Sequence, residues 1–338
     1  MAIRAFILLL PPVYKAGHVQ QQTHPIAMSI GELEFLDQLR LLASHPAARG
    51  LDDDVAVIGD LVLTHDMIAQ GVHFLASDPP ASVGWKLVAI NLSDLAAKGA
   101  EPIAALMGMS IMGDGKWETK FLAGMAAACE AYGVVLVGGD TIALPESAPR
   151  VLGLTALGRG GPNIPARSGG HPGDALWVVG TLGDAAVGLE LARDDEEAEG
   201  PLVEAYRRPV PQLAVGRLLA PHVTAMMDIS DGLLLDLARL CRASNCGAKV
   251  NLGSIPLSRE YIEVRGAGRQ SRIRAASAGD DYALLAALPD KFDPLALSLP
   301  AGTILERIGT LTESGGIRLH DSRGSVPLPE RLGYEHRA

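Results

Sequence analysis

Cysteine is scarce in this chain of 338 residues, which contains Cys129, Cys241 and Cys246 and no other cysteine. An odd number without a C-x-x-C pair argues against both a disulfide framework and a structural zinc site. The apolar run at residues 5–10 ends at two prolines and is shorter than a signal-peptide core or a membrane span. We therefore expect a cytoplasmic protein.

Aromatic residues and positive charge are also limited. The chain has 5 Phe, 3 Trp and 6 Tyr, so few side chains are available for stacking the bases of a single-stranded nucleic acid. Its 29 Lys and Arg residues face 39 Asp and Glu residues, and the formal net charge is −10. A DNA duplex or an anionic membrane would be repelled. We expect small-molecule partners, and neither a nucleic acid nor a membrane.

The familiar phosphate-binding loops are missing as well. The sequence contains no G-x-x-x-x-G-K-[ST] motif and no G-x-G-x-x-G motif after a predicted strand. Any nucleotide must therefore be held by other means.

The composition fits a folded protein with two cores. Hydrophobic residues make up 48% and charged residues 20% of the chain, whose length is about twice that usual for one domain. A stretch rich in glycine and proline at residues 158–173 indicates a boundary near residue 160. We predict an N-terminal domain over residues 28–160 and a C-terminal domain over residues 161–338. Residues 1–27 match no periodic pattern, and we expect a disordered or non-native extension there.

Both predicted domains mix helices and strands. Apolar residues at helical spacing predict helices over residues 33–42, 83–97, 117–132, 185–192, 211–219 and 233–242. Apolar and β-branched runs predict strands over residues 55–58, 61–64, 103–111, 134–137, 175–179, 224–227 and 282–288. The first two strands flank Gly59-Asp60 and are expected to form an antiparallel hairpin. This mixture predicts an α/β fold with mixed sheets of the α+β type.

Acidic side chains stand at many predicted strand ends and turns. They are Asp52, Asp53, Asp54, Asp66, Asp94, Asp140, Asp228, Asp231, Asp280 and Asp281. Two like charges about 4 Å apart repel by roughly 4 kcal/mol at an effective dielectric near 20, so several carboxylates in one cleft need cations to stay ionised. An all-oxygen site suits Mg²⁺, which bridges carboxylates to phosphates. If these residues converge, the sequence favours phosphoryl chemistry.

Some of these acids also have an ordinary structural explanation. Asn91, Asp94 and Lys98 form one polar stripe on an otherwise apolar helix, and a solvated Asp94–Lys98 pair would explain it. The acidic run at residues 194–197 is typical of a solvated loop.

Three further positions allow two interpretations. Ser230 and Asp231 precede a predicted helix and could serve only as its cap. The two glycines before Asp140 indicate either close approach of a ligand or a tight turn. His73, between Val72 and Phe74, could be a packed histidine.

Eight ordered segments carry a family resemblance. They are Asp53-Asp54-Val55-Ala56-Val57; His65-Asp66 with Gly71-Val72-His73-Phe74; Gly84-Trp85-Lys86 with Asn91-Leu92-Ser93-Asp94-Leu95-Ala96-Ala97; Gly138-Gly139-Asp140-Thr141; Arg167-Ser168-Gly169; Gly180-Thr181-Leu182-Gly183-Asp184-Ala185; Asp228-Ile229-Ser230-Asp231-Gly232-Leu233; and Gly279-Asp280-Asp281-Tyr282. Together they resemble the thiamine-monophosphate kinase family. Its superfamily includes aminoimidazole ribonucleotide synthetase and selenophosphate synthetase.

The resemblance implies an enzyme that transfers the γ-phosphoryl group of ATP directly to thiamine monophosphate, with several Mg²⁺ ions between the anions. It also implies two α/β domains, a homodimer paired through the N-terminal domains, and an active site in the cleft between the domains. By motif position, the implied metal ligands are Asp54, Thr64, His65, Asp66, Asp94, Asp140, Asp228 and Asp231. The implied ATP contacts are Gly139, Asp140, Arg167 and Ser230, and the implied thiamine contacts are His73, Asp280 and Tyr334.

The chain departs from the family pattern at Asp52, His65, Met67 and Ala283. At His65 a metal could meet the imidazole or only the main-chain carbonyl. Two alternative functions remain open: another ATP-using synthetase of the same superfamily, and a non-catalytic paralogue that binds a nucleotide or thiamine. Selenophosphate synthetase chemistry is the weaker case, because it needs a reactive cysteine near the N-terminus and the first cysteine is Cys129, in a predicted helix.

Overall fold

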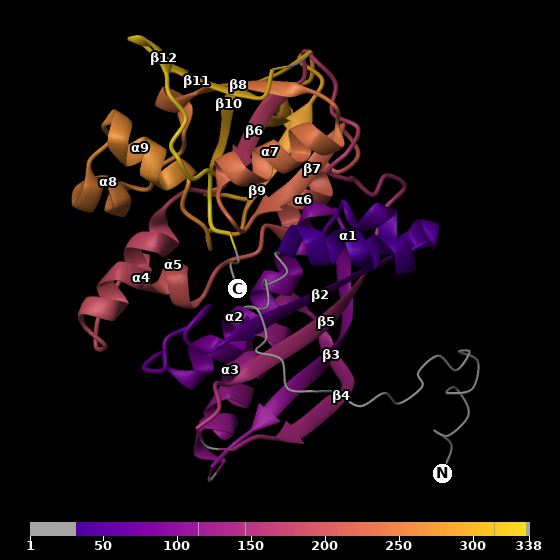
Figure 1. The fold of residues 1–338 in the computed structure, drawn as a ribbon, viewed down its shortest axis with the longest axis vertical. Coiled ribbons are helices and arrows are strands. Elements are labelled where there is room, and N and C mark those ends of the chain that lie inside the picture. The colour runs from indigo at the N-terminus through magenta and orange to yellow at the C-terminus, as the bar shows by residue number, and fades with distance from the viewer. Residues whose placement is uncertain (1–31, 114, 146, 314, 336–338) are drawn as a thin grey trace, which may run out of the picture.

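Two β-sheets organise the described part of the chain, which comprises residues 32–335 without residues 114, 146 and 314 in this computed structural model. Each sheet carries its own helices and forms one α/β domain, so the predicted fold class is confirmed. In Figure 1 the N-terminal domain, in indigo and magenta, lies below the C-terminal domain, in orange and yellow. The extension expected at residues 1–27 lies outside the described residues.

The N-terminal domain contains a five-stranded sheet. Its strands are β1 (Ala56–Ile58), β2 (Leu61–Ala69), β3 (Glu101–Ile111), β4 (Val135–Ala143) and β5 (Val151–Arg159). They are hydrogen-bonded in the order β1-β2-β5-β3-β4, and only β3 and β4 run parallel to each other. The helical elements are α1 (Glu32–Leu42), the short 3-10 helix η1 (Pro46–Leu51), α2 (Pro80–Ala97) and α3 (Lys116–Tyr132). Helices α2 and α3 lie along one face of the sheet (Figure 1).

The alternation of side chains along β2 separates the two faces of this sheet. Val62, Thr64 and Ile68 are buried, whereas His65 and Met67 are exposed. Successive side chains of a strand point to opposite faces, so the even-numbered residues of β2 face α2 and the odd-numbered residues face away. The covered face is therefore the one that can build a site with helix α2.

The C-terminal domain contains a seven-stranded sheet. Its strands are β6 (Ala175–Val179), β7 (Ala225–Ile229), β8 (Gly247–Asn251), β9 (Ala283–Leu288), β10 (Leu305–Thr312), β11 (Ile317–Asp321) and β12 (Gly324–Val326). Their order is β12-β11-β8-β10-β6-β9-β7. The helical elements are α4 (Asp184–Asp194), α5 (Pro201–Arg207), α6 (Leu213–Leu219), α7 (Leu233–Ala243), η2 (Leu252–Ser254), α8 (Arg259–Arg265), α9 (Arg269–Ala276) and η3 (Pro294–Ala296). None of the described helices is long and apolar enough to cross a membrane.

Helix α2 takes part in the cores of both domains. Leu87 packs into the core of the N-terminal domain, whereas Ala96 and Ala97 pack with Trp177 of the C-terminal domain. A Cβ atom at Gly216 would lie 2.0 Å from the carbonyl oxygen of Ala96, so α6 approaches α2 this closely only because residue 216 has no side chain. Polar side chains on α2 are thereby placed at the domain junction.

Most predicted elements are present with shifted ends. The predicted hairpin is confirmed as β1 and β2, and β2 continues to Ala69. The strand predicted at residues 134–137 extends to Ala143, and the strand predicted at residues 224–227 extends to Ile229, so Asp228 lies inside β7. The sequence does not predict β5 or β10, because glycines and charged residues interrupt their apolar patterns. The last described residues return from β12 to the domain junction (Figure 1).

Candidate functional site

Three carboxylates from separate parts of the chain meet at the domain junction. Asp54 precedes β1, Asp94 lies on α2, and Asp228 lies on β7 of the other domain. One oxygen atom from each of these carboxylates lies within 4.8 Å of the others. Asp94 and Asp228 are buried. The convergence on which the sequence-based hypothesis depends is therefore present for these three residues, which we call the acidic cluster.

Side-chain donors hold each carboxylate of the acidic cluster. The hydroxyl of Thr64 donates to Asp94, and the hydroxyl of Ser93 donates to Oδ2 of Asp228 over 2.9 Å. The guanidinium of Arg167 binds both oxygens of Asp54, with Nε 3.1 Å from Oδ2. Ser93 and Arg167 thereby tie the site together across the domains.

Asp66 extends the acidic cluster along β2. Its position in the strand turns its side chain to the covered face, which it shares with Thr64. The side-chain oxygen of Asn91 accepts a hydrogen bond from the backbone N–H of Asp66 over 3.0 Å and fixes β2 to α2. The amide of Asn91 in turn donates to the carbonyl of Leu87 over 2.9 Å. Asn91 therefore fixes the position of Asp66 relative to α2.

The acidic cluster carries more negative charge than its protein surroundings can neutralise. Burial, together with the neighbouring Asp54 and Asp231, raises the pKa of Asp66 to about 6. Burial and the nearby carboxylates also raise the pKa values of Asp94 and Asp228 well above their usual range. Carboxylates in this state bind hard cations that allow them to ionise. The donor set is all oxygen, which fits a divalent cation of the Mg²⁺ type.

The alternative explanation of Asp94 and Lys98 as an ion pair on a solvated face is wrong. Asn91, Asp94 and Lys98 are all buried. The ammonium of Lys98 lies 2.5 Å from Oδ1 of Asp53 and 3.9 Å from Oδ2 of Asp54. Although burial raises the pKa of Asp53, its ion pairs with Lys98 and Arg49 lower that pKa overall. Asp53 is thus a charged structural partner of Lys98 and Arg49, whereas Asp54 belongs to the acidic cluster.

The imidazole of His65 does not share the site. It lies on the uncovered face of the sheet, where Nδ1 is 2.8 Å from the hydroxyl oxygen of Thr155. The alternation along β2 sends its side chain away from Thr64 and Asp66. We therefore correct the expectation of an imidazole ligand, and only the main-chain carbonyl of His65 is kept as a candidate.

Asp140 is also separated from the acidic cluster within one chain. Three strand spacings, roughly 14 Å, lie between β2 and β4 in the sheet order. Met107 is buried under the helices, so its neighbour Gly108 faces the uncovered side, and Asp140 pairs with Gly108 and shares that side. A Cβ atom at Gly139 would lie 1.9 Å from the carbonyl oxygen of Met107. Close packing of β4 on β3 therefore already explains this glycine, without a nucleotide.

The segment after β7 is anchored by residues other than those suggested for capping α7. Gly232 occupies the cap position, and the carboxylate of Asp236 accepts the backbone N–H groups of Asp231 and Gly232, each over 3.1 Å. The side chain of Asp231 instead pairs with Arg239, 2.6 Å away. The carbonyl of Ser230 accepts the backbone N–H of Asp280 over 2.7 Å. The simple capping explanation is thus excluded for Asp231.

The resemblance assigns three residues to thiamine. Asp280 and Tyr334 lie beside the segment after β7, and His73 follows β2 in the N-terminal domain. Asp280 adopts a backbone φ of 74°, and its carboxylate lies 2.6 Å from the ammonium of Lys86. The backbone N–H of Tyr334 donates to the carbonyl of Asp231 over 2.9 Å, so the C-terminal segment closes on the site. The ring nitrogen Nδ1 of His73 accepts the N–H of Ala69 over 3.1 Å, which fixes the imidazole.

Sequence reasoning assigned no role to Lys86 or Ser93, and it considered Lys98 only as a partner of Asp94. Lys86 and Ser93 are buried polar residues on α2, and Lys98 is the buried residue that directly follows the helix. Their signal was available, because each polar residue interrupts a nearly continuous apolar pattern. Their side-chain partners, however, lie 45 to 194 residues away along the chain. Periodicity alone could show that these residues were unusual, and it could not show what they contact.

Two family models match this chain, one over the part that contains the five-stranded sheet and one over the part that contains the seven-stranded sheet. Residues 52–159 match the model of the AIR synthase related protein, N-terminal domain, and residues 171–322 match that of the C-terminal domain. The fold and the acidic cluster thus define a member of the AIR synthase related class. Among curated relatives, thiamine-monophosphate kinase from Caulobacter vibrioides is 36% identical over 313 residues, which cover 88% of this chain and 87% of that protein. The chain belongs to the thiamine-monophosphate kinase family.

Solved structures agree with this assignment. A structure described as AaThiL complexed with AMPPCP and TMP has a TM-score of 0.80 and 28% sequence identity, and the match covers 94% of this chain and 100% of that one. Thiamine monophosphate kinase from Aquifex aeolicus gives a TM-score of 0.76 at 29% identity, over 89% of this chain and 98% of that one.

The charge in the acidic cluster makes the stability of the metal-free protein depend on pH. Because the folded-state pKa of Asp66 is about 6, against 3.8 for the free side chain, folding favours the protonated acid. We expect the free energy of unfolding of the metal-free protein to fall by roughly 1–3 kcal/mol as the pH rises from 4 to 7, as measured by urea titration.

Millimolar Mg²⁺ is expected to restore that stability at pH 7 and to have little effect at pH 4. The variant Asp94→Asn removes one of the repelling charges, so its metal-free form is expected to be less sensitive to pH and to gain less from Mg²⁺. An equal gain from Mg²⁺ in the wild type and in this variant would argue against a cation at the cluster.

Proposed function

We propose that the protein transfers the γ-phosphoryl group of ATP to the phosphate of thiamine monophosphate and so forms thiamine diphosphate, with Mg²⁺ bound at the acidic cluster. The observation that supports this most directly is the meeting of Asp54, Asp94 and Asp228 from two domains. The family supplies the reaction, and the cluster supplies the charge environment that this reaction needs.

Both reactants are anionic, so catalysis depends on neutralising charge and on aligning the two phosphates. Bound Mg²⁺ supplies that positive charge. Asp54, Asp94 and Asp228 would hold it, together with Asp66 and the hydroxyl of Thr64 on the same face. Asp231, at the end of β7, is proposed as a further ligand. No nucleophilic side chain is needed, and the transfer is direct.

The guanidinium of Arg167 would contact a phosphate of ATP, because it already lies against Asp54 at the edge of the cluster. Ser230 and Gly139 are proposed as further ATP contacts by family position. His73, Asp280 and Tyr334 are proposed to bind thiamine monophosphate. We place the reaction in the cytoplasm, since the three cysteines of the chain are free thiols.

We also propose a homodimer that pairs through the uncovered face of the N-terminal sheet. Strand β4 is exposed along its whole length and carries Val135, Val137 and Ile142. Leu106 on β3 and Met67 on β2 continue this apolar surface across the sheet. Contiguous apolar surface of this kind marks a site of association. A second copy of the chain is the occupant that the family resemblance implies.

Such a dimer gives Asp140 a role that a single chain does not offer. Its side chain lies on the proposed interface, on the opposite side of the sheet from the acidic cluster of its own chain. We propose that Asp140 completes the metal site of the partner subunit. The interface would then be required for activity as well as for stability.

Asp228→Asn is predicted to lower kcat at least about a thousandfold, because a neutral amide cannot replace a carboxylate metal ligand. Turnover is measured as thiamine diphosphate formed from ATP, Mg²⁺ and thiamine monophosphate. The matched control is Asp194→Asn in the exposed acidic run, which is expected to match the wild type. Wild-type rates in Asp228→Asn would contradict the metal role, and tight binding of both substrates without product would support a non-catalytic paralogue.

The dimer hypothesis predicts recovery of activity from two inactive variants. Asp140→Asn and Asp228→Asn are co-expressed with different tags and purified together. If Asp140 acts in the partner's site, random pairing restores about one quarter of wild-type activity, because half of the dimers are mixed and each mixed dimer has one intact site. No recovery, or a monomer in light scattering, would rule out this arrangement.

A further inference from the structure

A buried cation outside the acidic cluster is Lys86, on α2. Its side chain is 2% exposed. The ammonium nitrogen lies 2.6 Å from Oδ2 of Asp280, which belongs to the C-terminal domain. It also donates to the carbonyl of His73 over 3.1 Å, and it lies 4.3 Å from the centre of the Tyr206 ring. The lysine thus bridges two residues that we assign to the thiamine substrate.

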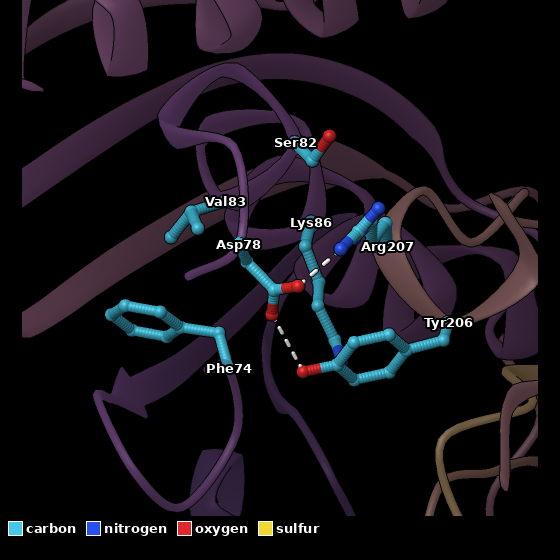
Figure 2. A pocket seen from close by; sticks show the side chains of 7 residues that line it. All are labelled: Phe74, Asp78, Ser82, Val83, Lys86, Tyr206 and Arg207. Atoms are coloured by element: carbon cyan, nitrogen blue, oxygen red, sulfur yellow. Dashed lines mark hydrogen bonds and ion pairs between the residues drawn. The ribbon is translucent and has the colours of Figure 1, made fainter. Parts of the chain in front are cut away.

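Lys86 also packs against residues from the loop before α2 and from α5. Figure 2 shows Lys86 beside the Tyr206 ring in a small pocket that is also lined by Asp78 and Arg207. The hydroxyl of Tyr206 donates to Oδ2 of Asp78 over 2.7 Å, and Nε of Arg207 donates to Oδ1 over 2.9 Å. Because Asp78 precedes α2 and the other two lie on α5, this network fixes the distance between the domains beside the lysine.

Asp280 needs such support because its backbone is strained. Asp280 adopts a φ of 74° and Tyr282 a φ of 50°. Both values lie in the left-handed region, which residues other than glycine rarely adopt. The residue between them, Asp281, is anchored by the backbone N–H groups of Gly183 and Ala185, over 2.7 and 3.3 Å. The remaining carboxylate oxygen of Asp280, Oδ1, accepts the hydroxyl of Tyr282 over 3.0 Å. Its orientation is therefore set by Lys86 on one oxygen and by Tyr282 on the other.

We propose that Lys86 is a positioning residue for the phosphate acceptor, and that it orients Asp280 and the main chain at His73 so that the two domains bind thiamine monophosphate together. The inference rests on the proposed function and extends it to a residue that touches neither reactant. Two of the three N–H groups of the ammonium are taken by oxygen atoms and the third faces an aromatic ring, so no donor is left for a phosphate. Lys86 therefore acts through Asp280 and His73.

A merely structural role would have a different signature. Lys86→Met removes only one partner of the ion pair with Asp280, so it is expected to lower stability whichever role the lysine has. A lysine that only held the domains together would show this loss of stability without a selective effect on one substrate. A positioning residue at the acceptor side changes the KM for thiamine monophosphate and leaves the KM for ATP alone. The split between the two KM values separates these roles.

The test compares Lys86→Met with the wild type in the thiamine diphosphate assay, with thermal melting as the check on folding. We expect the KM for thiamine monophosphate to rise about ten- to a hundredfold, which corresponds to losing a hydrogen bond to a charged group, while the KM for ATP changes less than about twofold. Should Lys86→Met fail to fold, Lys86→Gln keeps an amide donor toward His73 and is expected to show the same selectivity with a smaller rise.

Two further variants identify the route of the effect. Tyr206→Phe loses the hydroxyl that binds Asp78 but keeps the ring beside the ammonium. The Arg207–Asp78 ion pair still joins the two domains there, so both KM values are expected to stay at the wild-type level. In an Asp280→Asn background, adding Lys86→Met is expected to raise the KM for thiamine monophosphate less than about twofold further, because the two residues act as one unit. Additive effects in this pair, or equal rises in both KM values, would overturn the inference.

The outcomes also separate this inference from the function on which it rests. A wild-type protein that forms no thiamine diphosphate overturns both. A wild-type protein that turns over normally, together with a Lys86→Met variant whose KM values are unchanged, overturns only the role of Lys86.

Discussion

Repulsion among aspartates that lie far apart in the sequence is the constraint on which this structure depends. Asp54, Asp94 and Asp228 come from a loop, a helix and a strand of two domains, and their oxygen atoms meet within 4.8 Å. Burial at the domain junction removes the water that would screen these charges, so the protein tolerates them through protonation or through bound cations. In the proposed function, the same repulsion that destabilises the metal-free junction would give the site its affinity for a cation and for the phosphates bound to that cation.

Helix α2 makes this arrangement possible because it belongs to both cores. One polar stripe, formed by Asn91, Asp94 and Lys98, faces β2 and the loop before β1. A second stripe, formed by Lys86 and Ser93, faces the C-terminal domain and meets Asp280 and Asp228. The first stripe contributes to the proposed cation site, and the second joins that site to the side proposed for the acceptor. In this proposal, a single helix sets the relation between the two substrates.

The sequence was sufficient to predict the elements with strong periodicity and to single out the three aspartates of the acidic cluster as candidates. It predicted the hairpin of β1 and β2, the apolar helix α2 and the mixed fold class, because local patterns determine these features. It could not assign Asp94 its partner, since Thr64 lies 30 residues away and Lys98, four residues away, turns instead to Asp53. For a similar reason, the sequence could not show that the side chains of His65 and Asp140 lie on the face of the sheet away from the acidic cluster of their own chain. Which face of a sheet a residue occupies depends on strand register and on the helices that cover it.

A crystal structure of the protein with Mn²⁺ in place of Mg²⁺ and a non-hydrolysable ATP analogue tests the central claim most directly. The account predicts anomalous difference peaks bounded by Asp54, Asp94 and Asp228, with the phosphates of the analogue on the open side of those ions. Nucleotide bound with no ion among these three carboxylates, or ions bound only elsewhere on the surface, would contradict it.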